Sequence, residues 1–175
     1  MINPGANAKN TRCRSIIPSP WFIDYDTYPK VNEIWKKYLH TMAALTPDMI
    51  EAFKEVKVFP LATASKDGVP NVAPMGSVFL IDPETIWIGD NFMHKSLKNV
   101  LENPKAAVYI YGAGAKGCYQ VKADVTVKTS GPEHARMAEM IHEKKPNLPA
   151  KSLLILKVTG VFECMPGAEA GKQLV

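Results

Sequence analysis

Hydrophobic and polar residues alternate along much of the second half of the chain, which is the pattern of half-buried β-strands. Residues 119–129 show it best, because every odd position from Tyr119 to Val127 is apolar and the even positions between them are polar. Read in the same way, the chain predicts six strands, over residues 58–65, 71–81, 85–88, 106–111, 119–129 and 151–162.

Turn residues separate these strands. Asp67-Gly68 predicts a hairpin between the first two, because glycine supplies the positive φ that the turn needs. Pro74 and Gly76 lie inside the long second strand and predict a bend or a bulge there. Since the strands are joined by hairpins and short crossover helices, the predicted fold is mainly β, an antiparallel sheet closed into a barrel.

Apolar residues at helical spacing predict four helices. One covers residues 31–42, and a second begins at Thr46-Pro47-Asp48, where Thr46 caps the helix and Pro47 takes its first position. A third buries Leu97, Val100 and Leu101 and ends before Asn103-Pro104. The fourth follows Gly131-Pro132, and its predicted inner face uses Ala135, Ala138, Met140 or Ile141.

The first 45 residues form a predicted N-terminal arm and helix, and residues 46–175 form the barrel. Residues 1–30 contain four prolines and the aromatic residues Trp21, Phe22, Tyr25 and Tyr28. Large apolar side chains rarely stay in water, so the arm is expected to pack on its own domain or on a second subunit. A partly ordered tail is the alternative.

Composition narrows the class of protein. The 175 residues are 46% hydrophobic and 22% charged, as in an ordinary globular domain with a terminal extension. The net charge of +4 suits a small acidic ligand but is too low to predict nucleic-acid binding. No apolar run is long enough to span a membrane, and the first ten residues lack a signal-peptide core, so a cytoplasmic location is expected.

The start of the third helix carries charge of an unexpected sign. A helix N-terminus favours anions, because its first N–H groups have no partner and its dipole end is positive. Here it holds His94 and Lys95, both basic. An anion bound between the helix start, Lys95 and the Ser96 hydroxyl would resolve the conflict, and phosphate is the usual one. The alternative is a solvated helix start that is simply basic.

The sequence shows no arrangement of side chains that would carry out catalysis without a cofactor. The glycines of residues 112–117 lack the phosphate-loop spacing, and the histidines and the three cysteines form neither a nucleophile setting nor a metal-ligand cluster. We therefore predict no catalytic and no metal-binding residues, but a cofactor that brings the chemistry. The disrupted strand at Pro74-Met75-Gly76-Ser77 would leave main-chain groups free to bond a flat heterocycle, unless it is a plain bulge.

Three stretches together resemble the pyridoxamine 5′-phosphate oxidase-like, FMN-binding split-barrel proteins. They are residues 59–65, residues 67–76 and residues 89–100 with the run His94-Lys95-Ser96 followed by Asn99-Val100. The resemblance covers roughly residues 46–162. It implies a six-stranded split barrel that works as a homodimer, with FMN in clefts at the subunit interface.

The resemblance also implies the cofactor-binding residues. Lys95 and Ser96 would hold the FMN phosphate, with Asn99 nearby. His94, from the same run, is also counted as cofactor-binding. Pro74, Met75, Gly76 and Ser77 would follow the edge of the isoalloxazine ring. Thr63 would face the cofactor from the neighbouring strand, and Asp90 and Asn91 would lie beside the ribityl chain. Gln120 is similar to a glutamine that some members supply from the partner subunit.

The chain departs from true pyridoxamine phosphate oxidases, since it has neither their arginine-rich phosphate strand nor their C-terminal Arg-x-His residues. It is more similar to the small FMN-binding and flavoredoxin-like members, which implies an oxidoreductase or electron-transfer protein with an unknown electron donor or acceptor. Members of the fold also bind haem or the deazaflavin F420. A non-catalytic flavin- or haem-binding module, with His94 as the candidate haem ligand, and an F420-dependent reductase are therefore the alternatives.

Overall fold

The computed structural model describes residues 43–175. The helix predicted over residues 31–42 lies outside them, as does nearly all of the predicted N-terminal arm. The described chain enters the molecule at its core, where the N–H of Leu45 donates to the carbonyl of Pro83 (2.8 Å) and the Leu45 side chain is buried.

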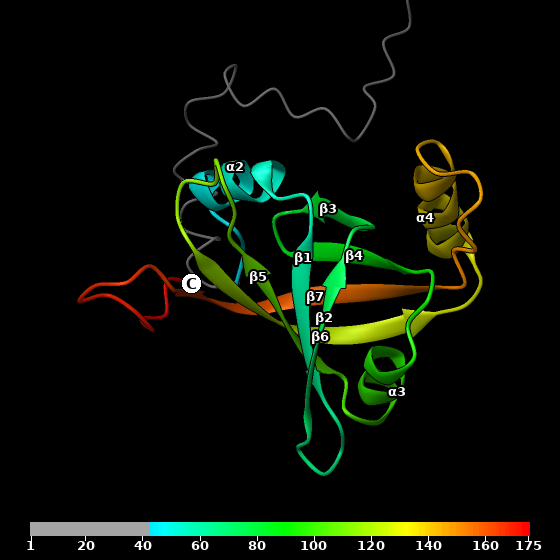
Figure 1. The fold of residues 1–175 in the computed structure, drawn as a ribbon, viewed down its shortest axis with the longest axis horizontal. Helices are drawn as coiled ribbons and strands as arrows, with labels where there is room; N and C mark the ends of the chain where they lie inside the picture. The colour runs from blue at the N-terminus through cyan, green and yellow to red at the C-terminus, as the bar shows by residue number, and fades with distance from the viewer. Residues whose placement is uncertain (1–42) are drawn as a thin grey trace, which may run out of the picture. The chain divides into compact units, whose positions relative to one another are not determined.

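One antiparallel sheet forms the body of the protein (Figure 1). Its seven strands lie in the order β2-β1-β5-β6-β7-β4-β3. Their bounds are Phe59–Ala64 (β1), Pro70–Met75 (β2), Val78–Asp82 (β3), Thr85–Asp90 (β4), Lys105–Ile110 (β5), Tyr119–Lys128 (β6) and Ser152–Glu163 (β7). The mainly β, antiparallel fold predicted from the sequence is confirmed.

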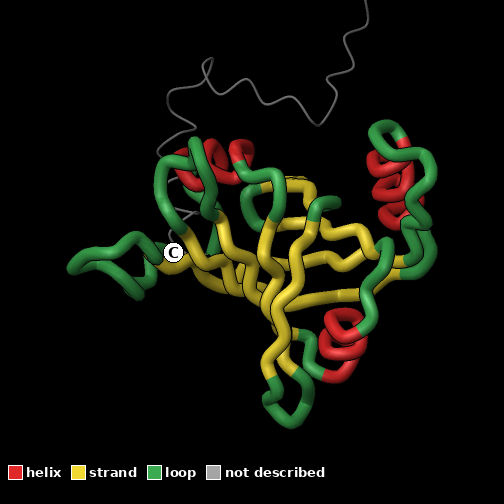
Figure 2. The backbone as a smooth tube through the Cα atoms, in the orientation of Figure 1, coloured by secondary structure: helices red, strands yellow, loops and turns green. Residues whose placement is uncertain are grey.

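The predicted count of six strands is wrong, because the second predicted strand is two strands. β2 pairs with β1 at one edge of the sheet, and β3 pairs with β4 at the other. In a flat sheet these edges would lie about 29 Å apart, at ~4.8 Å per strand. The three Cα steps from Met75 to Val78 reach at most about 11 Å. The sheet must therefore curl until its edges meet, which makes it a split barrel (Figure 2).

A backbone hydrogen bond marks this meeting point. The Gly89 N–H on β4 donates to the carbonyl of Ser77, in the two-residue connection between β2 and β3 (2.9 Å). The chain therefore changes edges at Gly76 and Ser77, within the stretch in which Pro74 and Gly76 predict a break of the ladder. That prediction was right about the position of the break and wrong about its size.

Helix α2 (Pro47–Glu55) follows the predicted start. The Thr46 hydroxyl accepts the N–H of Met49, and Pro47 occupies the first turn. Its apolar side packs into the barrel core, where the rings of Phe53 and Phe59 lie 4.5 Å apart. The odd positions of β6 point into the same core, as their alternation predicts.

Helix α3 (Lys95–Glu102) packs against β1, β2 and β6, and its buried face differs from the predicted one. Val100 is buried as predicted, but Leu101 is 65% exposed and the polar residues Ser96 and Asn99 are buried instead. The helix therefore turns polar side chains toward the sheet, which a search for apolar spacing cannot detect.

Helix α4 (Pro132–His142) forms a second, smaller core with Trp87 and Leu153, on β4 and β7. Ile141 is buried as predicted, but Met137 is buried as well and Ala135 is exposed. The helix lies so close to β4 that a Cβ atom at Gly89 would lie 2.4 Å from Ile141 Cδ1.

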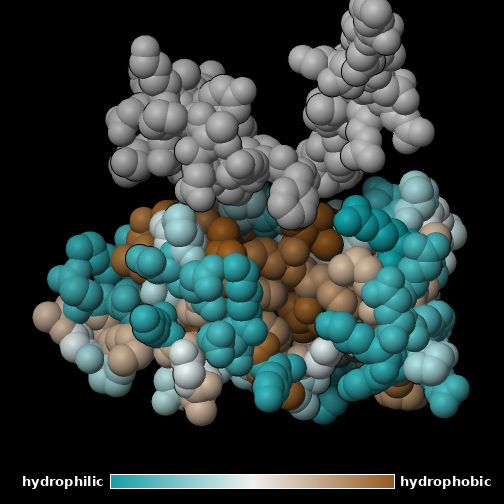
Figure 3. Space-filling view, turned by 90° about the horizontal axis from the view of Figure 1, so that it is seen from above, coloured by the Kyte–Doolittle hydropathy of each residue, from teal (hydrophilic) through white to brown (hydrophobic). Residues whose placement is uncertain are grey.

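Apolar side chains gather at the centre of the face seen in Figure 3, between more polar flanks. The edge strand β3 carries four consecutive half-buried apolar residues, from Val78 to Ile81. Among residues 43–175, no helix combines the length and the apolar character that crossing a bilayer requires.

Candidate functional site

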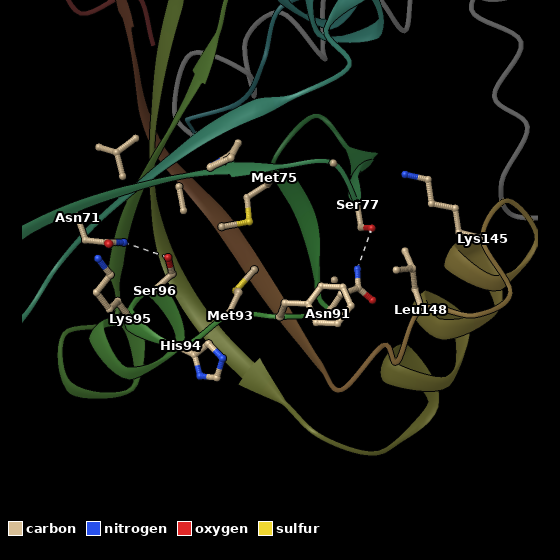
Figure 4. Close-up of a pocket in the computed structure, with 16 residues that line it drawn as sticks. Asn71, Met75, Ser77, Asn91, Met93, His94, Lys95, Ser96, Lys145 and Leu148 are labelled. Atoms are coloured by element: carbon tan, nitrogen blue, oxygen red, sulfur yellow. Dashed lines mark hydrogen bonds between the residues drawn. The ribbon is translucent and has the colours of Figure 1, made fainter.

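A pocket of about 550 Å³ lies where the two sheet edges meet (Figure 4). Three segments line it. They are residues 71–77, which include the β2–β3 connection, residues 89 and 91–96, which lead from β4 into α3, and the pair Lys145 and Leu148 from the loop after α4. The fold therefore brings together residues from the start, the middle and the end of the barrel.

One end of the pocket brings together groups of the kind that bind anions in proteins. The first N–H groups of α3 have no intrahelical partner, and the side chain of His94, which precedes the helix, does not cap them. Lys95 is exposed and, within residues 43–175, pairs with no carboxylate. Ser96 is 3% exposed and lines the pocket beside it. We call Lys95, Ser96 and these N–H groups the anion end.

A hydrogen-bond network holds Ser96 in place. The Asn71 side-chain amide donates to Ser96 Oγ (3.0 Å) and to Thr63 Oγ1 (3.2 Å). The buried Asn99 amide also donates to Thr63 Oγ1 (3.1 Å). Because Ser96 Oγ accepts a bond here, its own O–H stays available to donate toward the pocket. Thr63 and Asn99 thus support the anion end from behind.

The middle of the pocket is apolar. The side chains of Met75 and Met93 point toward each other from opposite walls, one on β2 and one on the loop before α3 (Figure 4). Methionine adapts to the shape of a neighbouring group and makes favourable contacts with aromatic rings. This part of the pocket therefore suits a flat, apolar body.

Asn91 joins the three walls at the other end. Its Nδ2 donates to Ser77 Oγ (3.2 Å), and its Oδ1 accepts the N–H of Ala150 (3.1 Å). The β2–β3 connection, the loop before α3 and the segment before β7 are thereby tied to one side chain. Asn91 fixes the width of the pocket at this end.

Asp90 lies under the pocket wall and does not line it. It is 1% exposed, and both carboxylate oxygens are occupied: one accepts the Met93 N–H (2.7 Å) and the other the Ser152 hydroxyl (3.0 Å). The carboxylate therefore shapes the loop that leads to Lys95. Asp90 thus belongs to the loop beside the pocket with its carboxylate turned inward, and its expected place beside the ribityl chain of FMN stays a prediction.

Gln120 lies elsewhere, on the outer face of the sheet. It stands opposite Tyr109 on β5 and Phe162 on β7, and it is not a lining residue. Cys118 Sγ and Tyr109 Oη are hydrogen-bonded (2.7 Å), and this bond and burial raise the pKa of Tyr109 to about 12. Tyr111, on the same face, is 59% exposed.

Eight of the twelve residues predicted to bind a cofactor line the pocket. They are Pro74, Met75, Gly76, Ser77, Asn91, His94, Lys95 and Ser96. Thr63 and Asn99 stand behind the wall, Asp90 lies beneath it, and Gln120 lies outside. That these residues contact FMN stays a prediction.

Sequence reasoning missed several lining residues, among them Asn71, Phe92, Lys145 and Leu148. Asn71 could have been found, because the hairpin at Asp67-Gly68 places it opposite Thr63. No local signal marks Lys145, which reaches the pocket only because α4 packs on β4. Among residues 43–175, no three His, Cys, Asp or Glu side chains lie close enough together to hold a metal ion.

Comparison with known families gives one family match, to the model described as pyridoxamine 5′-phosphate oxidase, over residues 45–165. A relative of uncharacterized function from Methanocaldococcus jannaschii is 40% identical over 136 residues, which are 75% of this chain and 89% of the relative. The region that matches the family model contains every lining residue of the pocket.

Many solved structures share the fold, and three of them show the range of proteins that use it. An FMN-binding protein from Syntrophomonas wolfei is 17% identical, with a TM-score of 0.59 over 75% of this chain and 95% of that one. The haem storage protein HutZ from Vibrio cholerae is 18% identical, with a TM-score of 0.54 over 69% and 94%. An F420 reductase is 17% identical, with a TM-score of 0.51 over 63% and 94%.

Proposed function

The chain belongs to the pyridoxamine 5′-phosphate oxidase family, and on that basis we propose that it is an FMN-binding flavoprotein, acting as an oxidoreductase or an electron carrier. The fold neighbours support flavin or haem binding in general. The observation that carries the more specific proposal is the anion end, where an uncapped helix start, Lys95 and Ser96 come together.

The donors at the anion end fit a phosphate. The N–H groups of a helix start and its positive dipole end both favour a bound anion. Lys95 adds a full charge, and Ser96 adds a hydroxyl held in place by Asn71. Among residues 43–175, no aspartate or glutamate lines the pocket, so a bound dianion would meet no lining carboxylate.

The rest of the pocket fits the remainder of FMN. Its volume of about 550 Å³ lies within the range of small-ligand sites. Met75 and Met93 offer apolar contact to a flat ring, and the Gly76-Ser77 connection offers main-chain groups to the polar edge of the ring. FMN would supply the redox chemistry, and the protein's part is to bind it, orient it and limit the access of water.

We also propose that the protein works as a homodimer. Gln120 lies on the outer face of the sheet, so it can serve the pocket only of a second copy. The exposed Tyr111 and the half-buried Tyr109 and Phe162 surround it, and aromatic residues are enriched at protein interfaces.

Sedimentation equilibrium of the full chain is expected to give a mass near twice 19.3 kDa. The reason is that the aromatic face around Gln120 would be covered by a second copy. A monomer at micromolar concentration, with FMN bound normally, would contradict the dimer while leaving the flavin site in place.

Haem is the second candidate ligand, because His94 lines the pocket and a ring nitrogen there could serve as an axial ligand. It ranks below FMN because Lys95 and Ser96 suit a phosphate and haem has none. F420 is a candidate ligand only because an F420 reductase shares the fold.

The visible absorption spectrum of the purified protein, followed by analysis of the ligand released on heating, tests the proposal. We expect flavin absorption bands and FMN in the released fraction. A Soret band or an F420 spectrum would replace FMN by that ligand. A colourless protein that does not bind added FMN would refute flavin binding altogether.

A further inference from the structure

Lys145 places a second cation at the end of the pocket opposite Lys95. Its side chain extends from the loop after α4 toward Ser77 (Figure 4). Like Lys95, it pairs with no carboxylate among residues 43–175. The two lysines therefore stand at the two ends of one pocket, with Met75 and Met93 between them.

The loop that carries Lys145 is held in position. The carbonyl of Lys145 accepts the Leu148 N–H (3.2 Å), and a ring nitrogen of His142 lies 2.8 Å from the Leu148 carbonyl. Ala150 is bonded to Asn91, and a ring nitrogen of His134 lies 3.1 Å from the Ala150 carbonyl. Lys145 and Leu148 are thus presented to the pocket by a fixed loop.

Bound FMN would offer an anionic group to only one of the two lysines. Its phosphate would occupy the anion end, and the oxidised ring has no second anionic group to offer Lys145. A cation on the wall of a concave, partly apolar pocket raises the local concentration of anions. The neighbouring Leu148 adds apolar surface to the same end.

We propose that Lys145 and Leu148 form a subsite for the redox substrate, a small organic anion with a carboxylate or phosphate group and an apolar body. This inference rests on the proposed FMN site. The anionic group would contact Lys145, and the apolar body would lie against Leu148, toward the middle of the pocket. Lys145 would then select substrates by charge, and Leu148 by their apolar surface.

Lys144 provides a control that distinguishes a specific subsite at Lys145 from a general effect of surface charge. It precedes Lys145 in the same loop, is also exposed, and does not line the pocket. A small anion inside the pocket would respond to Lys145 alone. A large acidic partner docking on this face would respond to both lysines.

The test titrates the ¹⁵N-labelled, FMN-loaded protein with two probes of matched shape, benzoate and benzamide. Binding of each probe is measured by NMR at low ionic strength. We expect shifts of the amides of residues 143–150 and benzoate binding about three- to tenfold tighter than benzamide binding, because only benzoate can pair with an ammonium group. Lys145→Ala should remove this preference, and Lys144→Ala should keep it. Leu148→Ala should weaken both probes alike.

Equal binding of the two probes, an unchanged preference in Lys145→Ala, or the same loss in Lys144→Ala would overturn the subsite. The titration is repeated on protein without FMN. If the protein never binds FMN, the proposed function fails, and a Lys145-dependent preference for benzoate would still identify the subsite. If FMN binds but the preference is absent, only the subsite fails.

Discussion

Replacing Lys95 with alanine is expected to weaken FMN binding by about ten- to a hundredfold. A charge-assisted hydrogen bond to a phosphate contributes roughly 1.5–3 kcal/mol, and each 1.4 kcal/mol is a factor of about ten. Lys95 has no carboxylate partner within residues 43–175 that its removal would leave unpaired. The free energy of unfolding of the apoprotein should therefore change little. Quenching of flavin fluorescence on binding measures the dissociation constant.

Lys98 provides the matched control. It lies on the same helix, its side chain is 75% exposed, and it points to Glu102 rather than into the pocket. Lys98→Ala removes the same charge from α3 and should change FMN affinity by less than about threefold, because exposed charges are screened. Equal losses in both variants would show that FMN responds to the overall charge of the helix. Unchanged affinity in Lys95→Ala would refute the phosphate assignment.

The fold was predictable where its cause is local. The alternation on β6 follows from a strand buried on one side, and the start of α2 follows from Thr46 and Pro47. The split of the second predicted strand was not predictable in this way. Residues 70–82 stay extended on both sides of Gly76-Ser77, and only pairing with β1 and β4, strands distant in sequence, shows that there are two strands.

The residues of the candidate site were likewise predictable only where a local sequence signal marks them. Lys95 and Ser96 carry a local signal, basic charge at a helix start, and both line the pocket. Asn71 required the register of a hairpin, and Lys145 required the packing of α4 on β4, which no short stretch of sequence encodes. Asp90 shows the converse, since it lies next to lining residues in the sequence while its carboxylate is turned into the protein.

Replacing Asp90 with alanine is expected to cost about 3–5 kcal/mol of unfolding free energy, the largest stability effect that the site predicts. The carboxylate is 1% exposed and accepts two hydrogen bonds, from the Met93 N–H and the Ser152 hydroxyl. Alanine leaves both donors without their acceptor, and each unsatisfied buried group costs about 1–3 kcal/mol. Urea unfolding followed by circular dichroism measures the loss.

The loop from Met93 to Lys95 should loosen in the same variant, because the Met93 bond is its anchor to Asp90. FMN affinity should therefore fall severalfold in protein that is still folded, although Asp90 does not line the pocket. This effect on binding distinguishes an anchor of the phosphate loop from a residue that only stabilises the fold.

Two further variants make the Asp90 result decisive. Asp82→Ala also removes an acceptor, that of the Glu84 N–H (2.8 Å), but at an exposed turn, and should cost less than about 1 kcal/mol. Ser152→Ala removes one of the two donors to Asp90. Combined with Asp90→Ala it should cost less than the sum of the single changes, because residues that share a bond are coupled. Additive losses would mean that Asp90 and Ser152 do not stabilise each other. A loss in Asp90→Ala no larger than in Asp82→Ala would mean that the buried carboxylate does not hold the loop that presents Lys95.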